Sequence, residues 1–212
     1  MLVGSVIEYT LTKLCYETNL EYKYEKILNN LTTCIIPNES NINPLLLVVY
    51  YDYLGLTYLK LSGFDNSGKY VVLAKEAFEM ASGFVGKVDM SMQIWAGFLY
   101  YNLARSCMML DELDDATKFY KKSILIRERW LKLTAFNYKI RNSLSSEYFL
   151  SKMSYLVMCE DKGILSVSEI CNEYEKLEIE ISAYSDVEYG IDPLTKIRNE
   201  LSTRKKHLEK SL

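Results

Sequence analysis

The segment Tyr51-Asp-Tyr-Leu-Gly-Leu-Thr-Tyr58 decides the fold, because its pattern returns at Tyr100-Tyr-Asn-Leu-Ala-Arg-Ser-Cys107. In both copies a leucine, a small residue and a larger residue follow the first tyrosine after three, four and seven positions. These offsets place the side chains on one face of a helix. A second helical pattern follows each copy, with an aromatic residue between small ones: Ala74, Phe78 and Ala81, then Ala116, Tyr120 and Ser123. Small residues opposite large ones predict paired helices that cross closely.

The composition favours helices over strands. Only 9 of the 212 residues are glycine and 3 are proline, so few residues are present that form tight turns between strands. Hydrophobic residues make up 49% and charged residues 25%, a balance typical of globular proteins. We therefore expect an all-α fold of antiparallel helical hairpins.

Helix boundaries follow from hydrophobic periodicity and from capping residues. Asn43-Pro44 and Asp192-Pro193 each place a side-chain acceptor before a proline, as at many helix starts. Ser166 and Glu169 have the spacing of a capping box. The predicted helices cover residues 4–18, 20–35, 44–62, 69–84, 90–110, 112–133, 139–160, 166–184 and 193–210.

The repeated hairpin pattern resembles the tetratricopeptide repeat (TPR), a family of helical scaffolds that usually hold another protein or a peptide. Leu54 and Leu103 lie 49 residues apart, against a usual TPR period of about 34. The surplus falls in two predicted loops, at 62–68 and 86–89, where insertions do little harm. The resemblance is clear over about 48–124 and implies a TPR-like α-solenoid with irregular flanking helices.

We expect a single TPR-like helical domain over residues 1–212. Two repeats alone would be marginally stable, because each buries its apolar face only against its neighbours. The flanking segments are therefore expected to act as caps. The predicted parts are a degenerate N-terminal hairpin (1–36), the clear repeats (44–133), a second degenerate hairpin (139–184) and a capping or docking helix (192–212).

The resemblance also implies a binding groove, which in TPR scaffolds is lined by the first helix of each hairpin. Carried onto this chain, the groove residues are Asp52, Leu56, Lys60, Phe98, Tyr101, Asn102, Arg105, Met108 and Met109. Tyr, Met and Arg are common at binding hot spots and adaptable surfaces. Helical spacing does not separate a binding face from a core face, so packing between helices stays the alternative for each tyrosine.

The expected function is a non-enzymatic protein–protein interaction scaffold that binds a peptide or helical segment of a partner in this groove. The apolar anchors would be Tyr101, Met108 and Met109. The residues that select charge would be Asp52, Lys60 and Arg105. An alternative is a ligand- or peptide-sensing regulatory domain that changes its oligomeric state, and a homo-oligomer stays open.

The sequence supports no enzyme, cofactor or metal site. Residues 63–69 match Gly-x-x-x-x-Gly-Lys, but Tyr70 stands where that nucleotide motif needs Ser or Thr, and the segment follows a predicted helix rather than a strand. His207 is the only histidine, which argues against His-based metal sites and catalytic triads. The five cysteines are widely spaced without Cys-x-x-Cys, and we expect reduced, mostly buried thiols.

The C-terminal segment adds a further hypothesis. Residues 194–212 carry six basic and two acidic residues, although the net charge of the chain is −3. A thin apolar stripe favours a helix that caps the last hairpin, formed by Leu194, Ile197, Leu201 and Leu208. The basic side leaves docking of an acidic partner, of nucleic acid or of a second copy open.

We expect a cytoplasmic protein that has no membrane contact. No basic region precedes an apolar run at the N-terminus, as it would in a signal peptide. The apolar run from Leu45 to Tyr51 is too short to span a bilayer. Nucleic acid is not favoured as a partner, because the chain has no global positive charge.

Overall fold

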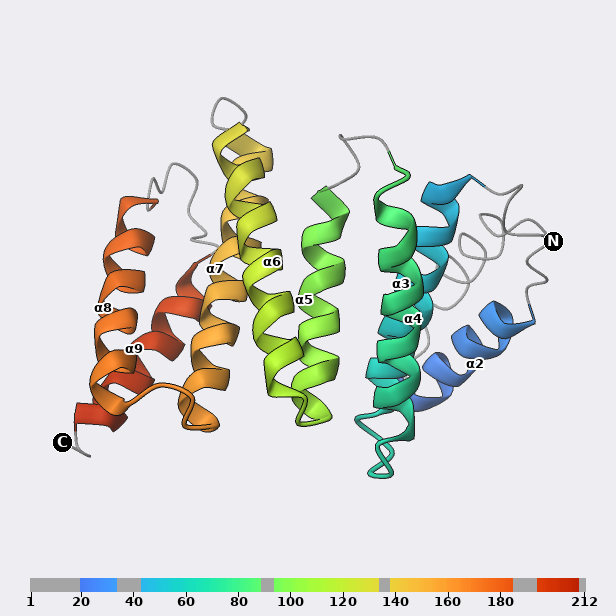
Figure 1. Ribbon diagram of the computed structural model, residues 1–212, viewed down its shortest axis with the longest axis horizontal. Helices are drawn as coiled ribbons and strands as arrows, with labels where there is room; N and C mark the ends of the chain where they lie inside the picture. The colour runs from blue at the N-terminus through green and yellow to red at the C-terminus, as the bar shows by residue number, and fades with distance from the viewer. Residues whose placement is uncertain (1–19, 34–42, 89–93, 134–137, 185–193, 210–212) are drawn as a thin grey trace. The chain divides into compact units, whose positions relative to one another are not determined.

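The computed structural model describes residues 20–33, 43–88, 94–133, 138–184 and 194–209. All regular secondary structure in these ranges is helical, so the predicted all-α fold is confirmed. Each helix matches a predicted one to within four residues at either end, and the helix predicted over 4–18 lies outside the described residues. The helices are α2 (Leu20–Thr32), α3 (Pro44–Leu61), α4 (Lys69–Val85), α5 (Ile94–Met109), α6 (Leu113–Leu133), α7 (Tyr138–Asp161), α8 (Val167–Ala183) and α9 (Thr195–Glu209) (Figure 1).

The chain divides into two compact units, with the boundary inside α6. The N-terminal unit is Met1–Phe119 and the C-terminal unit is Tyr120–Leu212. Of the described helices, the N-terminal unit holds α2 to α5 with the start of α6, and the C-terminal unit holds the rest of α6 with α7 to α9. The expectation of a single domain over 1–212 stays a prediction.

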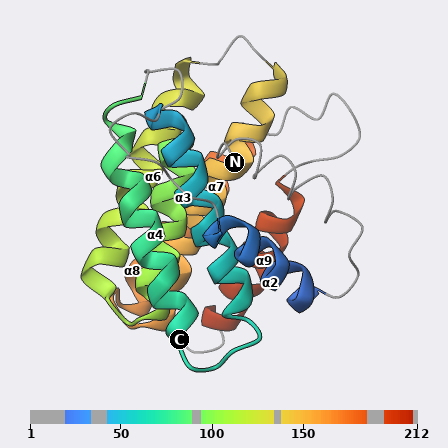
Figure 2. The ribbon, with the colours of Figure 1, turned by 90° about the vertical axis from the view of Figure 1, so that its right-hand side faces the viewer.

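In the N-terminal unit, α4 packs along α3, and α5 contacts both of them. Helix α2 contacts α3 and lies across it at an angle, as Figure 2 shows from the side of α2. The Tyr50 hydroxyl of α3 donates a hydrogen bond to the carbonyl of Leu31 (3.0 Å). The side chains of Ile27, Leu31 and Tyr50 form a small buried cluster that joins the two helices.

The seam between α3 and α4 uses the small and large residues of the repeated pattern. Phe78 of α4 is fully buried, and a Cβ atom on Gly55 of α3 would lie 2.6 Å from its ring. A residue without a side chain therefore allows this close approach. Next to it, Tyr51 stacks on Phe84 with nearly parallel rings, whose centroids are 6.2 Å apart.

Helices α5 and α7 end in the same kind of turn. Asp111, after α5, has a left-handed backbone (φ 62°), and the N–H of the next residue donates to the carbonyl of Cys107 (2.9 Å). After α7, Gly163 takes this conformation (φ 62°), and the next N–H donates to the carbonyl of Cys159 (2.9 Å). Both are Schellman motifs, which satisfy the carbonyls at a helix end and reverse the chain.

Two of the three predicted capping motifs fall within the described residues, and both are confirmed. The Asn43 side chain accepts a hydrogen bond from the N–H of Leu45, and Pro44 opens α3. Ser166 and Glu169 form a reciprocal capping box at the start of α8. The pair at 192–193 lies outside the described residues.

In the C-terminal unit, α8 packs on α7, and α9 contacts both helices. The predicted apolar stripe of this segment is buried, and its members are Leu194, Ile197, Leu201 and Leu208. Arg204 of α9 also donates to Glu160 (2.9 Å) and Asp161 (3.1 Å) of α7. The apolar stripe and Arg204 thus hold α9 on the α7–α8 hairpin, and its role as a capping or docking helix stays a prediction.

The C-terminal unit also buries a charged side chain, Arg127 of α6, which is 1% exposed. One guanidinium nitrogen donates to the Glu147 carbonyl (2.6 Å) and to the Ser151 hydroxyl of α7. The second terminal nitrogen lies 3.2 Å from the Glu147 carboxylate. Because a buried charge is costly unless it is paired, these contacts make Arg127 a link between α6 and α7.

Candidate binding face on helices α3 and α5

Helix α5 is buried on every side but one. Between residues 95 and 109 the side chains that reach solvent recur at helical spacing, and they are Trp95, Phe98, Tyr101, Arg105, Met108 and Met109. All other residues in this range are buried. The exposed positions form one stripe along the helix. Five of its six residues are predicted groove residues.

The predicted groove residues of α3 lie on the neighbouring helix, which contacts α5 directly. Lys60 is exposed and Leu56 is half-buried, whereas Asp52 is 7% exposed. We call these three residues and the six predicted on α5 the α3–α5 face. Asn102 is the second buried member, also 7% exposed, so seven of the nine predicted residues reach solvent.

Aromatic rings and a cation lie together along the α5 part of this face. The Arg105 guanidinium lies 5.8 Å from the centroid of the Tyr101 ring, one helical turn away, a distance at which a cation and an aromatic face attract each other. The Trp95 and Phe98 rings lie 6.1 Å apart. These contacts limit the freedom of side chains that a ligand would otherwise have to order.

Trp95 belongs to this surface, although the sequence analysis did not include it. It is 40% exposed and lies one turn before Phe98 on the same stripe of α5. Its position relative to Phe98 was a signal available in the sequence. The positions carried over to α5 from the resemblance began at Phe98, so they did not include Trp95.

Asp52 is the least ordinary residue of the α3–α5 face. Its carboxyl oxygen Oδ1 is buried and has no hydrogen-bond partner among the described residues. Burial raises the pKa of this carboxyl from 3.8 to about 7, because a charged carboxylate loses hydration in an apolar environment. Asp52 therefore keeps its proton to a higher pH than an ordinary aspartate. Its selection of charge in a partner stays a prediction.

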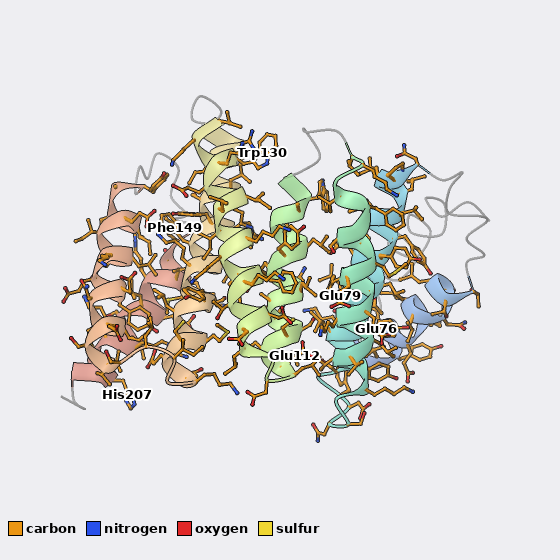
Figure 3. The ribbon with its side chains drawn as sticks, viewed as in Figure 1. Glu76, Glu79, Glu112, Trp130, Phe149 and His207 are labelled. Carbon is orange, nitrogen blue, oxygen red and sulfur yellow. The ribbon has the colours of Figure 1, made fainter. Side chains whose placement is uncertain are left out.

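A polar cluster joins α4 to the turn after α5. Lys75 of α4 lies 2.5 Å from the carboxylate of Glu112, which is labelled in Figure 3 at the turn between α5 and α6. This contact lowers the pKa of Glu112 and raises that of Lys75. Next to it, burial raises the pKa of the Cys107 thiol to about 12. At neutral pH this thiol is protonated and is not an activated nucleophile.

The described residues contain no group of three His, Cys, Asp or Glu side chains that could hold a metal ion. The loop with the Gly-x-x-x-x-Gly-Lys pattern follows α3 and is bonded within itself, since Asp65 accepts from the N–H and hydroxyl of Ser67. Gly68 has φ 73° and precedes α4 directly. This loop therefore joins two helices, whereas the nucleotide motif joins a strand to a helix.

No family model, curated protein or solved structure matches this chain. Within the described ranges, none of the helices is long and apolar enough to cross a bilayer.

Proposed function

We propose that this chain is a TPR-like interaction scaffold without enzymatic activity, which binds a peptide or helical segment of a partner across the α3–α5 face. One observation carries the proposal. Within residues 95–109 one stripe of α5 reaches solvent, and it holds every α5 position that the TPR resemblance predicts for ligand contact except the buried Asn102, together with Trp95, which was not predicted.

The packing order of the helices supports the TPR-like part of the proposal. In the N-terminal unit, α3 contacts α5 in addition to the α4 between them in sequence. In the C-terminal unit, α7 contacts α9 in addition to α8. Contact between the first helices of successive hairpins is what a groove lined by first helices requires. The close approach at Gly55 and Phe78 gives the repeated pattern its structural reason.

The chemistry of the face favours a protein ligand. Rigid aromatic rings, a flexible thioether and a guanidinium are the groups that contribute most at protein interfaces, and here they are Tyr101, Met108 and Arg105. Met109 is 48% exposed, more than a residue that serves only the core. A surface of this kind binds a segment with apolar side chains and one or more carboxylates.

Nucleic-acid binding through α9 receives less support from the structure. Arg204 is engaged by Glu160 and Asp161, and Lys205 forms an ion pair with Glu178. Basic residues already paired with carboxylates release fewer counterions when they meet phosphates. The interaction scaffold remains the function that we propose.

The test is a selection from a random-peptide display library with the full chain as bait, followed by hydrogen exchange on the complex. Peptides selected on this face should protect amides of α3 and α5. A set of selected peptides that protects only helices other than α3 and α5 would overturn the proposal.

A further inference from the structure

A second surface feature lies in the C-terminal unit, away from every residue of the α3–α5 face in sequence. Helices α6, α7 and α8 enclose a hollow of about 150 Å³. Its apolar lining comes from one residue of each helix, namely Ile124, Leu156 and Leu177. We call this hollow the α6–α8 pocket.

The hollow is partly open to solvent, and most of its exposed lining is apolar. A volume near 150 Å³ accommodates a small aromatic molecule such as benzene. It therefore suits one large apolar side chain. It is too small for the ligands of ordinary small-molecule sites, which occupy several hundred Å³.

One wall of the pocket is an aromatic ring that the fold holds in place. The ring of Tyr155 lies 6.3 Å from that of Tyr120. The hydroxyl of Tyr155 is hydrogen-bonded to the buried thiol of Cys159. An aromatic group in the pocket would pair with this ring in offset or edge-to-face geometry.

The charged side chains around the pocket are lysines and glutamates. Two lysines and one glutamate complete its lining, Lys152, Lys176 and Glu173. Lys176 is bound to Glu173 (2.6 Å) and Lys152 to Glu180. Lys121 lies over the Tyr155 ring, with its ammonium 5.8 Å from the ring centroid, and no ion pair joins it to another described residue. Its charge is thus available to an anion next to the pocket.

We propose that the α6–α8 pocket receives one aromatic side chain of a partner segment that carries a carboxylate beside it. The ring fills the apolar hollow against Tyr155, and the carboxylate pairs with Lys121. This site does not depend on the α3–α5 face, and it gives a scaffold a second, side-chain-sized point of attachment.

Three small probes separate the apolar part of this recognition from the charged part. Toluene supplies the ring alone, phenylacetate adds an anion, and phenethylamine adds a cation. The measurement is a methyl NMR titration of the full chain, following Ile124, Leu156 and Leu177. We expect all three probes to bind in the millimolar range, with phenylacetate roughly threefold to fivefold tighter than phenethylamine, the size of an exposed charge pair.

Variants locate the effect. Lys121→Met should weaken phenylacetate about threefold and leave toluene unchanged, whereas Lys118→Met, an exposed lysine one turn earlier on α6, should change neither. Ile124→Phe should fill the pocket and abolish binding of every probe. Titrations in which none of the three methyl groups responds, or in which phenethylamine binds as tightly as phenylacetate, would overturn the proposal. Either result leaves the proposal for the α3–α5 face untouched.

Discussion

Phe78 lies so close to Gly55 that a Cβ atom on the glycine would be 2.6 Å from the aromatic ring. The ring is fully buried, so it has little space into which it could move. The close approach of α3 and α4 at this point therefore depends on one missing side chain. This relationship explains why the sequence pattern places a small residue four positions after the tyrosine.

Gly55→Ala should consequently destabilise the protein, although alanine is the better helix former. The overlap with Phe78 costs about 1–3 kcal/mol, as in other overpacked cores, and exceeds the gain of up to 1 kcal/mol from helix propensity. Urea unfolding measures the difference. Gly83→Ala in α4 is the matched control, because nothing lies within 4 Å of a Cβ atom there, and it should leave the stability unchanged or raise it slightly. Equal stabilities of the two variants would contradict the close approach.

Arg127→Lys tests whether the buried guanidinium joins α6 to α7. A lysine ammonium cannot reproduce the contacts that both guanidinium nitrogens make, and loss of buried charge pairing costs about 3 kcal/mol. Arg129→Lys, two residues away and exposed, should cost less than about 0.5 kcal/mol. Thermal unfolding of both variants provides the comparison. If Arg127→Lys and Arg129→Lys unfold at the same temperature, the contacts of Arg127 contribute little to stability.

Asp52 should make stability depend on pH. Its folded-state pKa of about 7 lies above the unfolded value near 4, so the folded state binds the proton more tightly. The contribution to stability is therefore full below about pH 4, falls as the pH rises through 7, and is absent above it. The contribution of Asp52 to the free energy of unfolding changes by roughly 4 kcal/mol at most between these pH limits.

Asp52→Asn removes this titration and isolates it from the other ionisable groups. The variant should be more stable than the wild-type protein at pH 8, and the difference should shrink toward pH 4. Urea unfolding at several pH values gives both curves. Parallel curves for the two proteins would show that the carboxyl is not perturbed by burial.

The helices could be predicted from the sequence because their signals are local. Asn43 and Ser166 cap the helices they were expected to cap, and hydrophobic periodicity needs only a few turns of chain. The buried partner of Gly55 was also predictable in kind, since the repeated pattern pairs small residues with an aromatic one.

Other features depend on contacts between residues far apart in the sequence. Arg127 looks like one more charged residue of an amphipathic helix, and only Glu147 and Ser151 on the next helix make its burial tolerable. Asp52 was predicted to select charge in the groove, yet it is 7% exposed. The α6–α8 pocket arises from three helices at once, and no single segment encodes it.

The central claim is that the α3–α5 face binds a partner segment. Its most direct test is isothermal titration of a peptide selected by the wild-type chain against Tyr101→Ala/Arg105→Ala and against Met80→Ala, which alters an exposed residue of α4. Circular dichroism confirms that the variants are folded. We predict at least a tenfold rise in Kd for the double variant, the effect of losing a hot spot, and no change for Met80→Ala. An unchanged Kd for the folded double variant would contradict the claim.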